Sequence, residues 1–133
     1  MSLDLISNML SSLKNASMAG KEKIEVSYSK QCEEIAKLLK EKGFLSEVKV
    51  FKPKEASYKK LALTLAQDEG GNFKLTDVKR ISKPGRRLYQ GVHELHKISG
   101  GFGMSVLSTP KGILDGASAR KKNVGGEIIC EVL

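Results

Sequence analysis

The chain has 133 residues, of which 40% are hydrophobic, so it is long enough to bury a core in one domain or in two small lobes. Its formal net charge of +8 favours a polyanionic partner, either nucleic acid or an anionic surface. No apolar run approaches the roughly 20 residues of a membrane-spanning helix, and the first ten residues lack the basic stretch of a secretory signal. We therefore expect a soluble protein that does not enter a membrane.

The first segments along the chain predict a helix, a strand and a second helix. Apolar residues recur every three or four positions over residues 3–16, which indicates a short amphipathic helix. Residues 23–28 have the composition of a strand. Residues 29–43 predict the clearest helix, with Ser29 as its N-terminal cap and Gly43 at its end.

Three strands are expected next, arranged as a meander. Apolar and polar residues alternate over residues 44–51 and 61–65, and residues 73–82 predict the third strand. Polar turns at 53–57 and 68–72 separate the three segments.

A cationic Pro-Gly turn at residues 83–87 interrupts this pattern, and it marks an expected boundary between Ser82 and Lys83. The predicted fold class is α+β, with an N-terminal α/β lobe at residues 1–82 packed on a smaller β-rich C-terminal lobe at residues 83–133. The expected elements of the second lobe are a helical turn at 93–98, a glycine loop at 99–103, a strand at 104–107, a short helix at 116–123 and a strand at 127–133.

Positive charge is concentrated in two stretches of the chain. Residues 79–97 hold six cations and one acid, and residues 49–60 hold five lysines and one acid. Lysines that merely keep a surface solvated are the alternative explanation, but this clustering is less typical of a plain soluble surface. The distribution favours binding to a polyanion.

Side chains suited to catalysis or metal binding are sparse and badly spaced. His93 and His96 form an H-x-x-H pattern, whereas a metalloprotease helix needs H-E-x-x-H, and no third ligand is apparent. Cys32 and Cys130 are flanked by apolar residues, which indicates buried thiols in a reducing, cytosolic compartment. We therefore expect no enzyme, no metal and no cofactor.

The stretch Ser108–Gly112, "STPKG", lies between two apolar runs and has two interpretations. In one, it is a turn whose hydroxyls satisfy the local backbone. In the other, its hydroxyls, backbone N–H groups and lysine contact a nucleic acid. Tyr89, just after the cationic turn, favours the second interpretation, because exposed bases stack on aromatic rings.

The same residues carry a family pattern. Residues 106–133, "VLSTPKGILDGASARKKNVGGEIICEVL", resemble the C-terminal signature of the S-eight family of bacterial small-subunit ribosomal proteins. "DLISNMLSSLKNA" is similar to the family's opening helix, "YSKQCEEIAKLLKEKGFL" to its S-K helix and "RISKPGRRLY" to its Pro-Gly turn. The resemblance therefore covers nearly the whole chain, and its C-terminal block is the specific part.

The resemblance implies a two-lobed fold and a structural role in the small ribosomal subunit. Members bind an irregular stem in the central domain of 16S rRNA, help to assemble the 30S platform beside neighbouring small-subunit ribosomal proteins, and act without a membrane or cofactor. Many also repress translation of their own operon mRNA. A cytoplasmic ribosome is the expected location, and the sequence leaves an organellar ribosome open.

Carried over to this chain, the family's main RNA loop falls on Ser108, Thr109, Pro110 and Lys111. Supporting contacts fall on Tyr89, Gly126 and Glu127, and the S-K pair, which touches flanking backbone, falls on Ser29 and Lys30. We expect sequence-independent attraction of phosphates from Lys30, Lys83, Arg86 and Arg87.

Three details of this assignment stay open. Pro110 replaces a family serine, and Ser27 replaces the proline before the S-K pair, so the fine contacts differ from the family pattern. Glu127 either accepts from a base amino group or, as we favour, holds the loop through backbone N–H groups. The alternative functions are a small enzyme and a generic basic binding module without a ribosomal role.

Overall fold

The computed structural model describes residues 4–82, 85–91 and 103–133, and it confirms the α+β class. The chain divides into two compact units, Met1–Thr76 and Asp77–Leu133. This division precedes the expected boundary between Ser82 and Lys83, because the strand at 78–80 pairs within the second unit.

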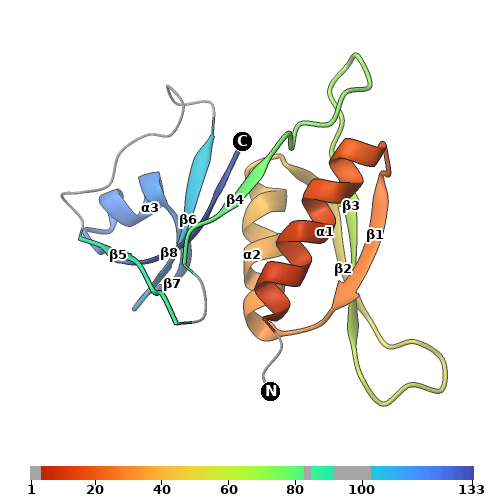
Figure 1. The fold of residues 1–133 in the computed structure, drawn as a ribbon, viewed down its shortest axis with the longest axis horizontal. Helices are drawn as coiled ribbons and strands as arrows, with labels where there is room; N and C mark the ends of the chain where they lie inside the picture. Colours follow the sequence, from red (N-terminus) through yellow and green to blue (C-terminus); the bar gives the residue numbers. More distant parts are fainter. Residues whose placement is uncertain (1–3, 83–84, 92–102) are drawn as a thin grey trace. The chain divides into compact units, whose positions relative to one another are not determined.

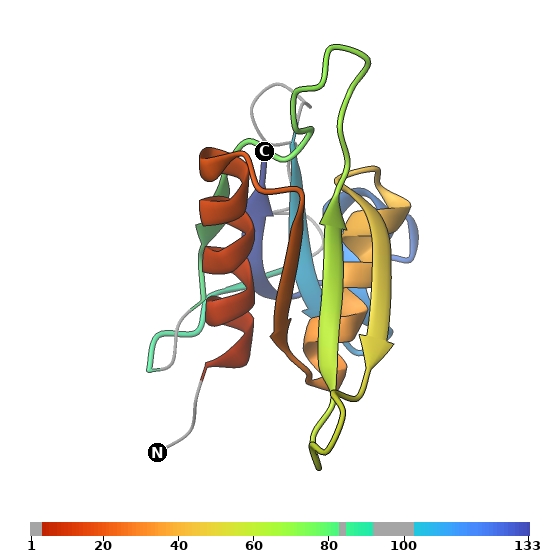
Figure 2. The same cartoon turned by 90° about the vertical axis from the view of Figure 1, so that its right-hand side faces the viewer.

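The first unit is a three-stranded antiparallel sheet with two helices on one face (Figures 1 and 2). The strand order is β1-β3-β2. The helices pack along the outer strands, α1 on β1 and α2 on β2. The elements in chain order are α1 (Leu5–Ala19), β1 (Lys23–Ser27), α2 (Lys30–Glu41), β2 (Leu45–Phe51) and β3 (Lys60–Leu65).

Local sequence signals account for these elements. The Asp4 carboxylate accepts a hydrogen bond from the Ser7 N–H at 3.0 Å and caps α1. The Ser29 hydroxyl accepts from the Cys32 N–H at 3.1 Å and caps α2, as predicted. Alternate residues of β3 are buried beneath the helices, as the period of a strand with one covered face requires. The core of this unit includes Met9, Leu13, Ile35, Leu39, Leu61, Leu63 and Leu65.

The described part of the second unit is an antiparallel sheet with one short helix. The strand order is β4-β8-β6-β7, and β5 also pairs with β8. Ala119 of the helix and Leu107 of the sheet form a small buried cluster. The elements are β4 (Val78–Arg80), β5 (Tyr89–Gln90), β6 (Met104–Thr109), β7 (Gly112–Asp115), α3 (Gly116–Lys121) and β8 (Gly126–Val132).

The expected third strand at residues 73–82 is wrong in extent and in partner. Only Val78–Arg80 is a strand there, and it pairs with β8 rather than continuing the meander. Asp77 and Leu133 extend this pairing through reciprocal backbone hydrogen bonds of 2.9 and 3.1 Å. The expected helical turn at 93–98 and most of the glycine loop lie outside the described residues.

Candidate nucleic-acid interface

The stretch "STPKG" is the end of a β-hairpin. Ser108 and Thr109 are the last residues of β6, Pro110 and Lys111 form the exposed turn, and Gly112 begins β7. The ring of Pro110 fixes its own φ angle, and Gly112 adopts a φ of 109°, which favours glycine. The sequence therefore builds a short, conformationally restricted projection at one end of the sheet.

The hydroxyl of Thr109 is engaged within this turn. It donates to the carbonyl oxygen of Gly112 at 2.8 Å and accepts from the N–H of Lys111 at 3.1 Å. A hydroxyl has one donor and two acceptor sites, so one acceptor site remains for a ligand. Both interpretations of the stretch thus apply to Thr109: its hydroxyl satisfies local backbone, and it can still accept one hydrogen bond.

Strand register places three of the expected site residues in a row. Glu127 of β8 is directly opposite Tyr89 of β5 on one side and Ser108 of β6 on the other. Residues directly opposite each other in a sheet share a face. Tyr89 is 68% exposed, and no described residue hydrogen-bonds the hydroxyl of Ser108. The row presents an aromatic ring, a carboxylate and a hydroxyl side by side.

A bulge in β8 sets this register. Val106 pairs with Cys130, but the next residue, Leu107, pairs with Ile128, so Ile129 is the extra residue. Without the bulge, Glu127 would be opposite Thr109 instead of Ser108. The bulge also explains why consecutive residues at 128–130 are all buried, which strict alternation does not allow.

Gly126 contributes space rather than a side chain. A Cβ atom there would overlap the carbonyl oxygen of Ser108 and lie 2.9 Å from the carbonyl carbon of Ser108. It would also lie 3.1 Å from the Cα atom of Thr109. A Cβ atom at Gly125 would likewise overlap the carbonyl oxygen of Gln90. Two adjacent glycines therefore let β8 approach its neighbouring strands closely, and Gly126 fixes the position of the hairpin backbone.

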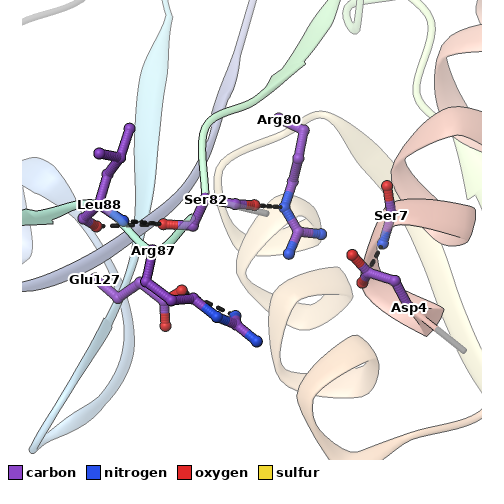
Figure 3. Close-up of polar contacts among 7 residues, drawn as sticks. All are labelled: Asp4, Ser7, Arg80, Ser82, Arg87, Leu88 and Glu127. Carbon is purple, nitrogen blue, oxygen red and sulfur yellow. Dashed lines mark hydrogen bonds and ion pairs between the residues drawn. The ribbon is translucent and has the colours of Figure 1, made fainter. Parts of the chain in front are cut away.

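Glu127 forms an ion pair with Arg87 across the sheet (Figure 3). The Nη1 atom of Arg87 donates to the Oε2 atom of Glu127 at 3.0 Å, and the carboxylate side chain is 19% exposed. The favoured expectation, that Glu127 holds the hairpin through backbone N–H groups, is wrong for this structure. The carboxylate instead holds Arg87 beside the row and neutralises part of its charge.

The buried Ser82 was not singled out as a site residue, yet it fixes the base of the cationic turn. Its hydroxyl accepts from the N–H of Leu88 at 2.9 Å and donates to the Leu88 carbonyl at 3.2 Å (Figure 3). Arg80 donates through Nε to the carbonyl oxygen of Ser82. Arg86 is exposed on this turn, and Lys83 lies outside the described residues. A serine between a strand and a Pro-Gly turn was the available signal.

Ser29 and Lys30 belong to the first unit. The hydroxyl of Ser29 is used as the cap of α2, and Lys30 is an exposed residue of the first turn. The remaining expected residues, apart from Lys83, are in the second unit.

The described residues offer little for catalysis. They contain no group of three or more His, Cys, Asp or Glu side chains placed to hold a metal ion. Burial raises the pKa of the Cys130 thiol to about 12, so this cysteine is not a thiolate nucleophile at neutral pH. No helix within the described part of the chain is long and apolar enough to cross a membrane. His93 and His96 lie outside the described residues.

Comparison with known proteins identifies the family. A family model described as ribosomal protein S8 matches residues 4–133. This chain belongs to the ribosomal protein S8 family. It is 38% identical over 129 residues to the small ribosomal subunit protein uS8 of Nautilia profundicola and 40% identical over 129 residues to that of Helicobacter pylori strain Shi470, with 97% of each chain covered in both comparisons. It is 39% identical over 132 residues to the uS8 protein of a Nitratiruptor species, again with 97% of each chain covered.

The resemblance stated from the motifs is confirmed over nearly the full length. S8 relatives carry names that place them in the small ribosomal subunit, and the chain is accordingly a ribosomal protein of that subunit.

Proposed function

We propose that this protein binds an irregular stem in the central domain of 16S rRNA through the row Tyr89–Glu127–Ser108 and the adjoining hairpin turn. The observation that supports the proposal best is the register of β5, β8 and β6, which sets a ring, a carboxylate and a hydroxyl side by side. The deep groove of regular A-form RNA is closed to side chains, so a narrow polar projection suits a distorted stem.

Each residue of the row has a chemical task in this proposal. Tyr89 offers an exposed ring on which an unpaired base or a sugar packs. Ser108 donates to or accepts from a base edge or a 2′-hydroxyl, and Thr109 accepts through its remaining lone pair. Lys111 lies at the exposed turn and meets a phosphate.

The Arg87–Glu127 pair gives the row a specific electrostatic character. The ion pair with Glu127 holds the Arg87 side chain in place, so Arg87 does not bind nearby phosphates freely. The Glu127 carboxylate can still accept a hydrogen bond from a base amino group. Phosphate attraction then comes mainly from Arg86, Lys83 and, on the first unit, Lys30. If about four phosphates are neutralised, the log–log dependence of affinity on salt has a slope of roughly −3 to −4.

A ribosomal S8 protein that binds the central domain early would help to assemble the 30S platform beside other small-subunit proteins in the cytoplasm. Repression of its own operon mRNA would use the same surface, provided that the message folds into a similar irregular stem. A generic basic RNA-binding module is the competing function, because the net charge of +8 alone attracts any polyanion.

Binding of the purified protein to two RNA stems tests the proposal. One is an irregular central-domain stem of the 16S rRNA of Helicobacter pylori, and the other is a fully paired stem of equal length. The proposal predicts tight binding to the irregular stem and only weak, strongly salt-dependent binding to the paired stem. Equal affinity for both stems at every salt concentration would leave only the generic module.

A further inference from the structure

The connection between β2 and β3 carries a second concentration of positive charge, in the first unit. Lys49 of β2 and Lys52, Lys54 and Lys59 of the connection are all exposed, and Glu55 is the one acid between residues 49 and 60. Lys60, the fifth lysine, is 4.0 Å from Glu25 and is partly neutralised by it. Four lysines therefore face solvent over a short length of chain.

This connection has a defined local structure. The N–H of Ala56 donates to the carbonyl oxygen of Pro53 at 3.1 Å, and Glu55 has a φ of 67°, so residues 53–56 form a closed turn. Lys54 lies at the corner of that turn. The chain projects beyond the sheet at the end where α2 begins (Figures 1 and 2).

Two contacts hold the base of the connection to the rest of the unit. The Nζ atom of Lys59 lies 5.3 Å from the centre of the Tyr28 ring, within the range of a cation–π contact. The Tyr28 hydroxyl in turn donates to the Oε1 atom of Glu33 at 3.0 Å. That hydrogen bond raises the pKa of Tyr28 above its ordinary value, so the phenol keeps its proton. Tyr28 immediately precedes Ser29 and Lys30, which joins the connection to the exposed start of α2.

Tyr58 distinguishes this surface from a plain solvated loop. Its side chain is 60% exposed and follows the turn, directly before Lys59. Stacking a base on this ring would remove apolar surface from water, which is favourable. Proteins that bind single-stranded RNA combine such rings, on which bases stack, with cations that follow the RNA backbone.

We propose that Lys52, Lys54, Tyr58 and Lys59, together with Lys30, form a second RNA-binding surface on the first unit. Its ligand is an unpaired or irregular RNA segment, with one base stacked on Tyr58 and three or four phosphates near the lysines. This surface deepens the RNA-binding function proposed above and rests on it, because the ligand is taken to belong to the same RNA.

An RNA ligand fits this surface better than a protein ligand. Lysine is depleted in protein–protein interfaces, whose centres are apolar and desolvated, whereas residues 52–59 offer only one large exposed apolar side chain. The surface is rich in compact point charges, which is the composition of sites that neutralise phosphates.

Charge removal with a matched control tests the surface. The test variant is K52Q/K54Q/K59Q, and the control variant is K21Q/K40Q/K42Q, which removes three exposed lysines near the opposite end of the sheet. The RNA is a central-domain fragment of Helicobacter pylori 16S rRNA that includes the irregular stem and its flanking segments. The test variant should bind it roughly tenfold or more weakly near 0.15 M salt, with a salt slope shallower by roughly 2. In the control variant, the loss of affinity and the change in salt slope should each be at most about half of those in the test variant.

Tyr58→Ala should weaken binding to the same fragment by roughly fivefold or more, and Tyr58→Phe should restore it, because stacking needs the ring and not the hydroxyl. If Tyr58→Phe is as weak as Tyr58→Ala, or if the lysine test and control variants behave alike, the surface is not an RNA-stacking site. Retained α-helical circular dichroism and melting temperature show that each variant is folded.

A directed probe locates the RNA independently of affinity. Cys32 and Cys130 are fully buried, so a cysteine introduced at the exposed Ser57 is the reactive thiol of the folded protein. An iron chelate on that cysteine should cleave RNA at a defined segment, whereas the same chelate at Glu69→Cys, beyond the opposite end of β3, should not cut there. No cleavage from position 57 by a protein that still binds the fragment would overturn this inference alone. Failure of the wild-type protein to prefer the irregular stem would overturn the proposed function instead.

Discussion

The β6–β7 hairpin of the second unit and the β2–β3 connection of the first unit both present polar groups at the end of a sheet, but they are built differently. In the hairpin, strand register, a bulge and the glycine pair fix the positions of hydroxyls and a carboxylate, and Arg87 is paired. In the connection, three exposed lysines and one exposed ring lie within eight residues of each other in the chain, from Lys52 to Lys59. Fixed hydrogen-bonding groups suit discrimination between RNA shapes, whereas exposed point charges suit affinity for any nearby phosphate.

The largest effect should come from breaking the geometry of the hairpin. Gly126→Ala places a Cβ atom against the backbone of Ser108, so β8 and β6 must separate or shift. We expect a loss of stability of about 1–3 kcal/mol and a loss of preference for the irregular stem, because overpacking moves the backbone. Chemical denaturation and binding to both stems measure the two effects.

Gly70→Ala is the matched control for that substitution. A Cβ atom at Gly70 lies 3.4 Å from the Asp68 side chain and its φ angle is not positive, so the methyl group is accommodated. Its stability should change by less than about 0.5 kcal/mol, as for an ordinary surface substitution. Equal effects of the two glycine substitutions would contradict the role given to Gly126.

Ser82→Ala removes the hydroxyl that holds the base of the cationic turn. The Leu88 N–H loses its 2.9 Å partner, and the loss of a partly buried hydrogen bond costs about 1 kcal/mol. Stability should fall by that amount, and binding to the irregular stem should weaken because Arg87 ends this turn and Tyr89 follows it. Ser11→Ala, at an exposed position of α1, should leave both measurements unchanged. A stable Ser82→Ala protein with full affinity would show that the turn does not position these residues.

Thr109→Ala should cost roughly 1 kcal/mol of binding free energy to the irregular stem, because it removes an acceptor and two hydrogen bonds within the turn. Thr109→Ser keeps the hydroxyl and should retain most of the affinity. Isothermal titration calorimetry of each variant with the irregular stem measures the two binding free energies. If the serine variant binds as weakly as the alanine variant, the methyl group and not the hydroxyl is what matters.

The smallest expected effect is that of Glu127→Gln, which tests whether Arg87 is restrained while the lysines of the β2–β3 connection are not. Glu127→Gln releases Arg87 from its ion pair, so nonspecific affinity for the fully paired stem should rise a few-fold and the salt slope should steepen by about 1. The same substitution should weaken binding to the irregular stem. A combined Arg87→Gln and Glu127→Gln variant should return the paired-stem affinity to the wild-type value. An unchanged salt slope in Glu127→Gln would mean that the pair does not restrain Arg87.

The sequence predicted features that depend on neighbouring residues. The Ser29 cap, the buried alternation of β3 and the turn at "STPKG" follow from local chemistry, and the structure contains each of them. The pairing of Val78–Arg80 with β8, the extra residue Ile129 and the Arg87–Glu127 contact depend on the pairing of segments far apart in the chain. Local pattern carries no information on such pairings, so the role of Glu127 in particular was not predictable.

The most direct measurement is the ratio of affinities for the irregular and the fully paired stem, determined for three proteins at equal salt. These are the wild type, the hairpin variant Ser108→Ala/Thr109→Ala and the connection variant K52Q/K54Q/K59Q. If the row and the hairpin discriminate RNA shape, the ratio should fall toward one in the hairpin variant and stay within about twofold of the wild-type ratio in the connection variant. A hairpin variant that keeps the wild-type ratio would contradict the account.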